Sequence, residues 1–382
     1  MRIVIVGAGH AGVALADNLR RRRFEGSITL VSDEERLPYH RPPLSKGVLA
    51  ADGAGPPALR PQSFYSGEIS LRHEGARAIQ PVRRTVMLGS GEHLGYDRLV
   101  LATGSRPRRL AVPGAGRDGV FHLRSVVDAE RLSTALAPGA RLVIVGAGYV
   151  GLEVAASARK RGCEVTLIER AARVLARSAS PDFAARIEAL HRANGVDIRL
   201  GRTVSELAGD GAVRTVHTSE GDAIACDCVL VGIGAEPASG LAEAAGLTCA
   251  DGICVDASHA TSTPDIFALG DCASVPSRRY GRRIRHESIG AAQAQARVLA
   301  AVLADEEPPP EELPWFWSDQ YGHKLQMAGL PMRADRLVVE DSADTGGLSI
   351  LHERAGRICA VECLDRPDAY IAAKRTMEAA ER

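Results

Sequence analysis

The sequence predicts an α/β protein in which two Rossmann-type nucleotide-binding domains are nested and a small α+β domain follows at the C-terminus. Three observations support this fold class. A glycine fingerprint occurs twice, a strand-and-turn stretch also occurs twice, and a proline-rich linker precedes the last part of the chain. At 382 residues, the chain is also too long for one small hydrophobic core.

The first fingerprint is Gly7-Ala8-Gly9-His10-Ala11-Gly12. It follows an apolar run at residues 3–6, which is typical of a parallel strand covered on both faces, and it opens a predicted helix. A second strand is expected at 27–31, followed by Asp33, with Glu34 as the alternative acceptor for a ribose hydroxyl. A glycine fingerprint between a strand and a helix, with an acidic residue roughly 20 positions on, predicts a dinucleotide site.

The second fingerprint is Gly146-Ala147-Gly148-Tyr149-Val150-Gly151, and its first glycine lies 139 residues after that of the first copy. A strand is predicted at 142–145, a helix at 151–160 and a further strand at 164–168. In both copies the glycines permit a tight turn, close approach of backbone amides to a pyrophosphate, and packing of helix on strand. The phosphates would face a helix N-terminus, whose partial positive charge suits them. Two such sites indicate two nucleotide cofactors, and hydride transfer from a nicotinamide to a flavin is the usual reason for such a pair.

Glu169 ends the last of these predicted strands. A carboxylate there accepts a hydrogen bond from a ribose 2′-hydroxyl and repels a 2′-phosphate, by up to roughly 4 kcal/mol for two unit charges about 4 Å apart. The residue therefore favours NADH over NADPH. Arg170, Arg173 and Arg177 leave the alternative open, because an arginine can bind the phosphate.

The stretch Tyr96–Pro107 matches Cys226–Pro237 at an offset of 130 residues, with an aspartate, a glycine and a proline in equivalent places. Each stretch predicts a strand that runs into a glycine turn beside its own fingerprint strand. The first nucleotide domain is therefore interrupted by the second. The predicted domains are 1–108 together with 236–305 for the first, 109–235 for the second, and 306–382 for the C-terminal domain.

The last third of the chain predicts a long helix and then a strand-rich region. The helix is expected at about 290–303, and a linker at 305–310 contains three prolines. The likeliest strands of the C-terminal domain are 338–340, 348–352 and 358–362.

Composition excludes several classes of protein. Lys+Arg and Asp+Glu are both 47, so the net charge gives no sign of a nucleic-acid partner. No apolar run approaches the roughly 20 residues that span a bilayer, and no secretory signal is visible, so a cytoplasmic protein is expected. The eight cysteines begin at Cys163 and contain neither a Cys-x-x-Cys pair nor zinc spacing, which favours scattered reduced thiols and no metal site.

The segment Leu37–Lys46 is rich in proline and is predicted to be a stiff loop, with Lys46 beginning or preceding a helix. The loop leaves the first nucleotide site where a flavin ring is expected. A cation near a flavin there would stabilise the reduced, anionic cofactor, and a carboxylate partner would limit the cost of burying it. Three alternatives remain open. Lys46 could be an ordinary surface cation, and Glu153 could be an ordinary acid on a helix face. Trp315 and Trp317 could simply pack in the core.

The combined motifs resemble one known family. The fingerprint at 7–12, the run Arg41-Pro42-Pro43-Leu44-Ser45-Lys46, Ala102-Thr103-Gly104, Gly270-Asp271 and Pro314–Tyr321 are similar to those of the FAD-dependent, NADH-linked ferredoxin reductases. That family includes the putidaredoxin, rubredoxin and dioxygenase-component reductases. The resemblance covers nearly the whole chain and implies a glutathione-reductase-like fold with FAD, NAD and C-terminal domains. NADH would reduce FAD, and electrons would pass to a [2Fe-2S] ferredoxin or a rubredoxin that supplies a monooxygenase or dioxygenase.

The resemblance also implies site residues by matching position. Lys46 and Glu153 are the candidate catalytic pair near flavin N5, Asp271 would bind the ribitol chain, and Trp317 would lie beside the flavin near the ferredoxin face. The residues expected to hold FAD are Gly7, Gly9, His10, Ala11, Gly12, Asp33, Arg41, Lys46, Ala102, Thr103, Gly104, Arg124, Gly270, Asp271, Ile289 and Trp317. Those expected to serve NADH are Gly146, Gly148, Tyr149, Val150, Gly151, Glu153, Glu169, Gly232 and Glu287.

The chain departs from the family's usual pattern in two places. Residues 287–292 read Glu-Ser-Ile-Gly-Ala-Ala where the family usually has Glu-Ser-Val-Pro-Asn-Ala, and Pro237-Ala238 replaces Pro-Asn. These departures affect local flavin and nicotinamide contacts rather than the fold.

The expected partner is an acidic iron–sulfur protein. The basic residues Arg278, Arg279, Arg282 and Arg283 would attract it through complementary charge. The reductase itself is expected to be a monomer or a weak dimer. Two alternatives remain. A disulfide or peroxide reductase needs a reactive thiol near the flavin, and an NADH-sensing flavoprotein of the apoptosis-inducing-factor type is chiefly a binding protein.

Overall fold

The computed structural model describes residues 1–382 except 51–52, 68, 332–333, 343–345 and 381–382. The chain divides into two units. The first comprises residues 1–40, 57–106 and 236–314, and the second comprises 41–56, 107–235 and 315–382. The chain therefore passes from one unit to the other five times, after His40, Pro56, Arg106, Ala235 and Pro314.

A five-stranded sheet in the order β19-β7-β1-β2-β3 forms the centre of the first unit. Every neighbouring pair in it is parallel, as a doubly wound nucleotide-binding sheet requires. Its strands are β1 (Arg2–Val6), β2 (Ser27–Val31), β3 (Ile69–Arg72), β7 (Arg98–Leu101) and β19 (Ile266–Ala268).

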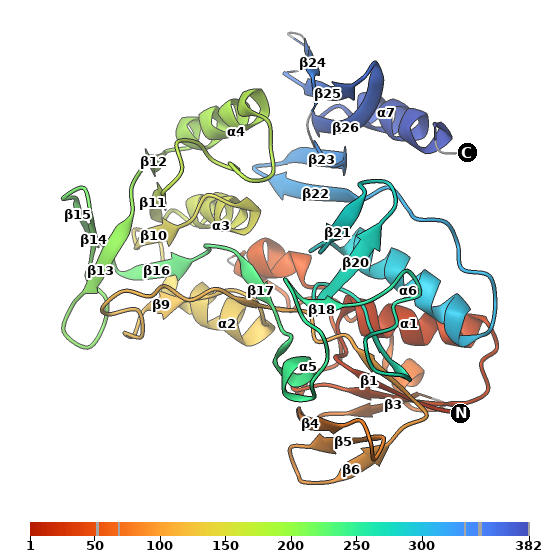
Figure 1. The fold of residues 1–382 in the computed structure, drawn as a ribbon. Coiled ribbons are helices and arrows are strands. Elements are labelled where there is room, and N and C mark those ends of the chain that lie inside the picture. Colours follow the sequence, from red (N-terminus) through yellow and green to blue (C-terminus); the bar gives the residue numbers. More distant parts are fainter. Residues whose placement is uncertain (51–52, 68, 332–333, 343–345, 381–382) are drawn as a thin grey trace. The chain divides into compact units, whose positions relative to one another are not determined.

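Different layers cover the two faces of this sheet. Alternation along β1 sends Ile3 and Ile5 into the core shared with α1 (His10–Arg21) and α6 (Ile289–Leu303), which lie side by side in Figure 1. Val4 and Val6 pack on the opposite face, under the antiparallel strands β4 (Ala76–Gln80), β5 (Thr85–Leu88) and β6 (His93–Gly95) and helix α5 (Gly240–Ala244). Burial on both faces explains why β1 is apolar throughout.

The first unit also contains short elements at its periphery. They are the 3₁₀ helix η3 (Gln62–Tyr65) and the strands β18 (Ile253–Cys254), β20 (Ala273–Ser277) and β21 (Arg282–Ile284), of which β20 and β21 form a hairpin.

The second unit repeats this plan. A sheet in the order β12-β11-β10-β16-β9 is parallel throughout, with helix α3 (Tyr149–Lys160) packed on β10 and β11. An antiparallel layer, β13 (Val204–Ala208), β14 (Thr215–Thr218) and β15 (Ala223–Ala225), covers the other face. The sheet strands are β9 (Val120–Phe121), β10 (Arg141–Val145), β11 (Glu164–Glu169), β12 (Val196–Leu200) and β16 (Cys228–Val231), and the further helices are α2 (Val126–Ala135) and α4 (Pro181–Ala193).

The C-terminal residues form an antiparallel sheet in the order β22-β23-β26-β25-β24, with α7 (Pro367–Ala379) packed on β26 and β23. Its strands are β22 (Trp315–Gln320), β23 (His323–Gly329), β24 (Arg336–Asp341), β25 (Leu348–Arg354) and β26 (Arg357–Leu364). Figure 1 shows the last three strands and α7 in blue. The three strands predicted for this region are confirmed, and β22, β23 and α7 are added to them.

The predicted α/β fold class is confirmed, and the matching stretches behave as predicted. β7 pairs with β1, and β16 pairs with β10, both in parallel. The short strands β8 (Ser105–Pro107) and β17 (Ala235–Pro237) lie where the chain crosses between the units. The division into three domains stays a prediction.

The prediction that residues 37–46 form a stiff loop, neither strand nor helix, is wrong for residues 42–45. Residues Pro42–Ser45 form the 3₁₀ helix η1, because a proline at the first position already has a helical φ and needs no amide donor. Lys46 separates η1 from a second 3₁₀ helix, η2 (Gly47–Leu49), so it does precede a helix. Within the described part of the chain, no helix has the length and apolar character that crossing a membrane requires.

Candidate functional site

Three loops meet at the carboxyl edge of the first parallel sheet. The fingerprint follows β1, Ala102–Gly104 follow β7, and Gly270-Asp271 follow β19. Because these strands are parallel neighbours, their carboxyl ends lie at one edge, which is where open α/β sheets bind ligands. The structure therefore brings together the first-unit residues that the sequence assigned to FAD.

The glycines of the first fingerprint have two different roles. A Cβ on Gly7 would lie 2.1 Å from the carbonyl oxygen of Ala102, and one on Gly12 would lie 2.0 Å from that of Gly7. These two positions hold helix α1 against the sheet. A Cβ on Gly9, in contrast, would meet no atom within 4 Å. The open space beside Gly9, at the N-terminus of α1, fits the close approach of a pyrophosphate.

The second fingerprint has the same geometry. A Cβ on Gly146 would lie 2.4 Å from the carbonyl oxygen of Gly232, and one on Gly151 would lie 2.2 Å from that of Gly146. Gly148 faces open space as Gly9 does. Each unit thus has an open cradle beside a helix N-terminus, and both cradles suit a dinucleotide.

Polar side chains around the first cradle are held by their neighbours. Ser105 Oγ donates to Asp271 at 2.9 Å, and Thr103 Oγ1 donates to the carbonyl oxygen of Ala238 at 2.7 Å. Asp33 is exposed at the end of β2, whereas Glu34 accepts a hydrogen bond from Tyr39. The exposed Asp33 is therefore the more accessible of the two candidate ribose acceptors.

Two further predicted residues, Glu287 and Ile289, lie at the N-terminus of helix α6. Ile289 is its first residue, after the cap Ser288, whose hydroxyl accepts from the amide of Ala291. Glu287, expected to serve NADH, forms an ion pair with Arg285 and belongs to the first unit, whereas the other residues expected to bind NADH belong to the second. His10 contacts the ring of His40, with 5.4 Å between the ring centroids.

Glu169 is tied to the loops around the second cradle. Its two carboxylate oxygens accept hydrogen bonds from the backbone amides of Ala147 and Ala171, each at 2.8 Å. The side chain therefore fixes the fingerprint turn. Each carboxylate oxygen still has a second lone pair for a ribose hydroxyl.

One face of α3 is directed at strand β22. Tyr149 stacks on Phe316 with 4.6 Å between ring centroids, and its hydroxyl lies 2.8 Å from the sulfur of Met327. Burial raises the pKa of the Tyr149 hydroxyl well above its usual value. Residues 149, 153 and 157 are spaced i, i+4, so they point to the same side of the helix.

Glu153 forms a salt bridge with Lys46, the pair that the family resemblance implies. Lys46 Nζ lies 2.8 Å from Glu153 Oε1, and the two side chains are 23% and 7% exposed. Ser45 and Ser318 also donate to this carboxylate, and Ser157 Oγ donates to the backbone carbonyl of Ser45. The pair is therefore a buried, hydrogen-bonded ion pair rather than a surface contact.

A pocket of about 380 Å³ adjoins this pair. Its walls come from η2, the C-terminal half of α3 and the hairpin between β22 and β23. Charged lining residues of both signs give it no single preferred ligand charge. These are Lys46, Glu153, Lys160, Arg161 and Asp319.

The remaining predicted residues of the second unit are also placed. Trp317 stacks on Trp315 with 5.5 Å between ring centroids, on the side of β22 opposite to Ser318, and Lys374 lies over the Trp315 ring. Arg41 donates to the backbone carbonyl of Arg124 at 2.6 Å. Core packing alone does not describe the tryptophans, because both are partly exposed.

The most deeply buried cysteines are unsuited to a reactive site. All eight cysteines are free thiols. Burial raises the pKa of the Cys226 thiol to about 11 and of the Cys228 and Cys363 thiols to about 12. Such thiols are protonated at neutral pH and are poor nucleophiles.

Comparisons with known proteins agree with this geometry. Residues 1–296 match the pyridine nucleotide-disulphide oxidoreductase family, and residues 315–382 match the reductase C-terminal family. The chain is 42% identical to rhodocoxin reductase of Rhodococcus erythropolis, over 99% of this chain and 89% of the relative. It is 43% identical to putidaredoxin reductase of Pseudomonas putida, over 96% and 89%.

A solved structure of the covalent putidaredoxin reductase–putidaredoxin complex matches with a TM-score of 0.94 and 42% identity, over 98% of this chain and 92% of that one. The chain therefore belongs to the FAD-dependent pyridine nucleotide-disulphide oxidoreductases. Within that family it groups with the ferredoxin reductases, which use FAD and NAD(P)H.

Sequence reasoning missed several residues of the site. Ser45 and Ser318 both bind the Glu153 carboxylate, and Ser318 in turn contacts Gln320. The spacing of Ser318 and Gln320 was a usable signal, because polar residues two apart share one face of a strand, but no strand was predicted there.

Proposed function

We propose that this protein is an FAD-dependent reductase that takes reducing equivalents from NADH and passes electrons to a [2Fe-2S] ferredoxin serving an oxygenase. The observation that carries the proposal is the pair of open cradles at Gly9 and Gly148 in a chain whose Lys46–Glu153 ion pair lies on a loop and a helix without cysteine. The similarity to a reductase solved in complex with putidaredoxin supports ferredoxin as the acceptor.

The proposed division of labour follows from the geometry of the chain. When bound, FAD accepts a hydride from the nicotinamide and releases electrons one at a time. The glycine turns and helix N-termini bind the pyrophosphates, and Asp271 and Asp33 are proposed to hold the ribitol chain and the adenosine ribose. Glu169 is proposed to select NADH. Lys46 would supply positive charge to the reduced cofactor, and Glu153 holds its ammonium in place.

No residue of the chain needs to act as a nucleophile in this scheme. The rival scheme, reduction of a disulfide or peroxide, requires a thiolate. Cys272, which follows Asp271, is completely buried, and burial raises the pKa of its thiol. Free thiols throughout the chain also support the proposal of a reducing, cytoplasmic location.

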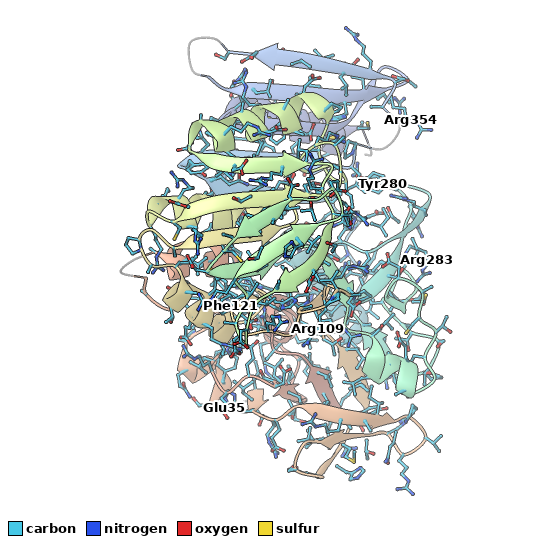
Figure 2. The ribbon with its side chains drawn as sticks, turned by 90° about the vertical axis from the view of Figure 1, so that its left-hand side faces the viewer. Glu35, Arg109, Phe121, Tyr280, Arg283 and Arg354 are labelled. Atoms are coloured by element: carbon cyan, nitrogen blue, oxygen red, sulfur yellow. The ribbon has the colours of Figure 1, made fainter. Side chains whose placement is uncertain are left out.

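The docking face proposed for the ferredoxin is the β20–β21 hairpin, whose turn residue Tyr280 and strand residue Arg283 are labelled in Figure 2. Arg278 and Arg282 are exposed, and Arg279 is partly exposed. Arg283 donates to the backbone carbonyl of Ser274, so we assign it a structural role. A basic hairpin would attract an acidic ferredoxin through complementary charge.

The decisive experiment measures turnover with two acceptors. FAD-loaded protein is expected to be yellow, to bleach on anaerobic addition of NADH, and to reduce both ferricyanide and a [2Fe-2S] ferredoxin such as putidaredoxin. Bleaching without ferredoxin turnover would favour an NADH-sensing protein instead. Loss of ferricyanide reduction on changing any one cysteine to serine would favour the thiol-based rival.

The docking face has its own test. Changing Arg278, Arg279 and Arg282 to glutamate is expected to slow ferredoxin reduction at low salt by roughly tenfold or more, because electrostatic steering acts on the encounter rate. Ferricyanide reduction stays unchanged. Arg83→Glu, an exposed arginine elsewhere in the first unit, is the matched control. Equal slowing by that control would remove the hairpin from the proposal.

A further inference from the structure

Behind the Lys46–Glu153 pair lies a chain of buried polar side chains that none of the proposed cofactor contacts uses. Ser318 Oγ is 2.6 Å from Glu153 Oε1, and Gln320 Nε2 is 3.0 Å from Ser318 Oγ. His191 Nε2 is 2.8 Å from Gln320 Oε1, and the hydroxyl of Tyr321 is 3.5 Å from His191 Nδ1. All of these residues belong to the second unit.

The three inner members of this chain, Ser318, Gln320 and His191, are almost completely removed from solvent, whereas the terminal Tyr321 is partly exposed. Ser318 and His191 are 0% exposed and Gln320 is 1% exposed. A buried polar group without a partner costs about 1–3 kcal/mol, so a sequence keeps such groups in an apolar interior only where each finds its bond. Here Ser318, Gln320 and His191 each have a partner on both sides.

The direction of each hydrogen bond follows from the ionised carboxylate. An ionised Glu153 can only accept, so Ser318 must donate its one proton to it. Gln320 must then donate its amide N–H to Ser318, and its oxygen must face His191. His191 therefore carries its proton on Nε2, and Nδ1 accepts from Tyr321. Burial lowers the pKa of His191, which agrees with the neutral imidazole that this order requires.

All donors in the series thus point toward one carboxylate. Ser45, Lys46 and Ser318 surround Glu153 directly, and Gln320 and His191 fix the orientation of Ser318. If Gln320 cannot donate, the Ser318 hydroxyl is free to turn away from Glu153. Lys46, whose side chain is 23% exposed, would then keep only part of the environment that holds its ammonium.

We propose that Ser318, Gln320 and His191 are positioning residues, which act through Glu153 to hold the Lys46 ammonium in one place for flavin chemistry. The proposal rests on the proposed function for the role of Lys46. It makes a separate statement about the chain itself, namely that the location of the Lys46 ammonium depends on a glutamine and a histidine that do not contact it.

The composition of the chain makes the location of Lys46 directly measurable. The sequence contains only four lysines, at 46, 160, 324 and 374. Labelling with an amine-reactive reagent, followed by mass spectrometry of the peptides, reports the reactivity of each one. The other three lysines serve as controls within the same molecule.

The experiment compares Gln320→Leu and Ser318→Ala with the unchanged protein, both as FAD-loaded holoenzyme and after FAD removal. We expect Lys46 to be labelled roughly tenfold faster in both variants, the order expected for loss of one buried hydrogen bond, with the other lysines unchanged. Ser349→Ala, which changes another buried serine of the C-terminal sheet, should leave Lys46 as it is.

A functional readout separates positioning from a purely structural role. In the holoenzyme, both variants should shift the absorption bands of bound flavin and slow flavin reduction by NADH roughly tenfold, with the Kd for NADH unchanged. Ser318→Thr keeps the hydroxyl, so its flavin spectrum and its rate of flavin reduction should match those of the unchanged protein. On a Glu153→Gln background, Gln320→Leu should have no further effect, because its route to Lys46 is already broken.

The outcomes distinguish this proposal from the proposed function. Unchanged labelling of Lys46 in Ser318→Ala and Gln320→Leu would overturn the positioning role, whatever the activity. Faster labelling together with an unaltered flavin spectrum and reduction rate would also overturn it, because the position of Lys46 would then have no influence on the flavin. A protein that binds no flavin but shows the labelling change would overturn the proposed function and leave the hydrogen-bond series established.

Discussion

The two fingerprint helices, α1 and α3, occupy equivalent places in the two units but face different neighbours. Both follow a strand and a glycine turn, and both are followed by a parallel strand. Residues His10, Ala14 and Asn18 of α1 correspond, at the 139-residue offset, to Tyr149, Glu153 and Ser157 of α3. The shared backbone therefore carries two different faces.

On α1 the equivalent positions carry no carboxylate. Ala14 packs on the apolar core, and Asn18 donates to the carbonyl of Ala14 within the helix. On α3 the same positions face β22 and hold a buried carboxylate with three donors. The comparison teaches that the fingerprint specifies the phosphate-binding turn alone, whereas the residues one and two helical turns later decide what chemistry the helix supports.

The largest expected effects come from the first glycine of each copy. Alanine at Gly7 or Gly146 would place a Cβ 2.1 or 2.4 Å from a carbonyl oxygen, at φ of +113° or +107°. Gly7→Ala is expected to abolish FAD binding, and Gly146→Ala to abolish NADH binding while the protein stays yellow. Flavin absorbance and an NADH titration measure the two results.

The matched controls for these glycines are Gly91→Ala and Gly221→Ala. Both have positive φ but no atom within 4 Å of the added Cβ, so they suffer backbone strain of about 1 kcal/mol without a clash. If the controls lose cofactor as completely as the fingerprint variants do, close packing of the turn is not the reason.

A second contrast concerns two buried histidines, one in each unit. His259 is 2% exposed and its Nδ1 contacts the carbonyl of Ala268, whereas His191 contacts side chains at both nitrogens. Burial lowers the pKa of His259 from 6.5 to about 4. As the pH falls from 6.5 to 4, this histidine binds a proton in the unfolded chain but stays neutral in the folded chain. The free energy of unfolding therefore decreases by about 3 kcal/mol.

This loss is measured as the decrease in thermal unfolding temperature between pH 7 and pH 4. His259→Asn keeps a side-chain N–H and cannot ionise, so the variant is expected to be less sensitive to acid over this range. His93→Asn, at an exposed position on β6, should retain the full sensitivity. Identical pH curves for His259→Asn and the unchanged protein would contradict the lowered pKa.

The middle glycines should give a smaller and purely functional effect. Gly9 and Gly148 face open space, so alanine at either position should leave the fold intact. The methyl group would instead occupy part of the cradle. We expect roughly tenfold weaker binding, of FAD for Gly9→Ala and of NADH for Gly148→Ala. Titration calorimetry measures both, and an affinity equal to that of the unchanged protein would mean that the cradle lies elsewhere.

The smallest expected effect is a change in coenzyme preference, which should distinguish Glu169 from Asp33, the acidic residues that follow the two fingerprints. Glu169→Ala should reduce the preference for NADH over NADPH by up to roughly tenfold, because a carboxylate repels the 2′-phosphate. Asp33→Ala should leave this preference unchanged and weaken FAD binding slightly. The ratio of kcat/KM for the two coenzymes decides the matter, and an unchanged ratio in Glu169→Ala would refute its assigned role.

Much of the fold was accessible from the sequence because it rests on local signals. Strand β2 was expected at 27–31 and begins and ends there, and the two stretches that match each other do pair beside their fingerprint strands. Apolar runs bounded by glycine turns specify such strands without reference to distant residues. Strand β22 was missed, although its residues were quoted for their similarity to the family.

The parts of the site that were not predicted depend on distant contacts. The pairing of Lys46 with Glu153 came from resemblance, whereas Ser318 and His191 join it from positions 165 and 38 residues away from Glu153 along the chain. Nothing local to His191 distinguishes it from an ordinary helix residue, because its partner Gln320 lies on another element. Contacts of this kind require the tertiary fold.

Because the chain crosses between the two units five times, truncation at any crossing point would leave at least one unit incomplete. Prolines stand at three of these passages, at Pro56-Pro57, Pro107 and Pro314, and neither unit is a continuous segment. A fragment that stops at Pro314 would therefore lack strand β22 and leave Glu153 without its donor Ser318. The interlaced path makes the polypeptide indivisible, so inserted tags or fused partners belong at its ends or in exposed hairpin turns.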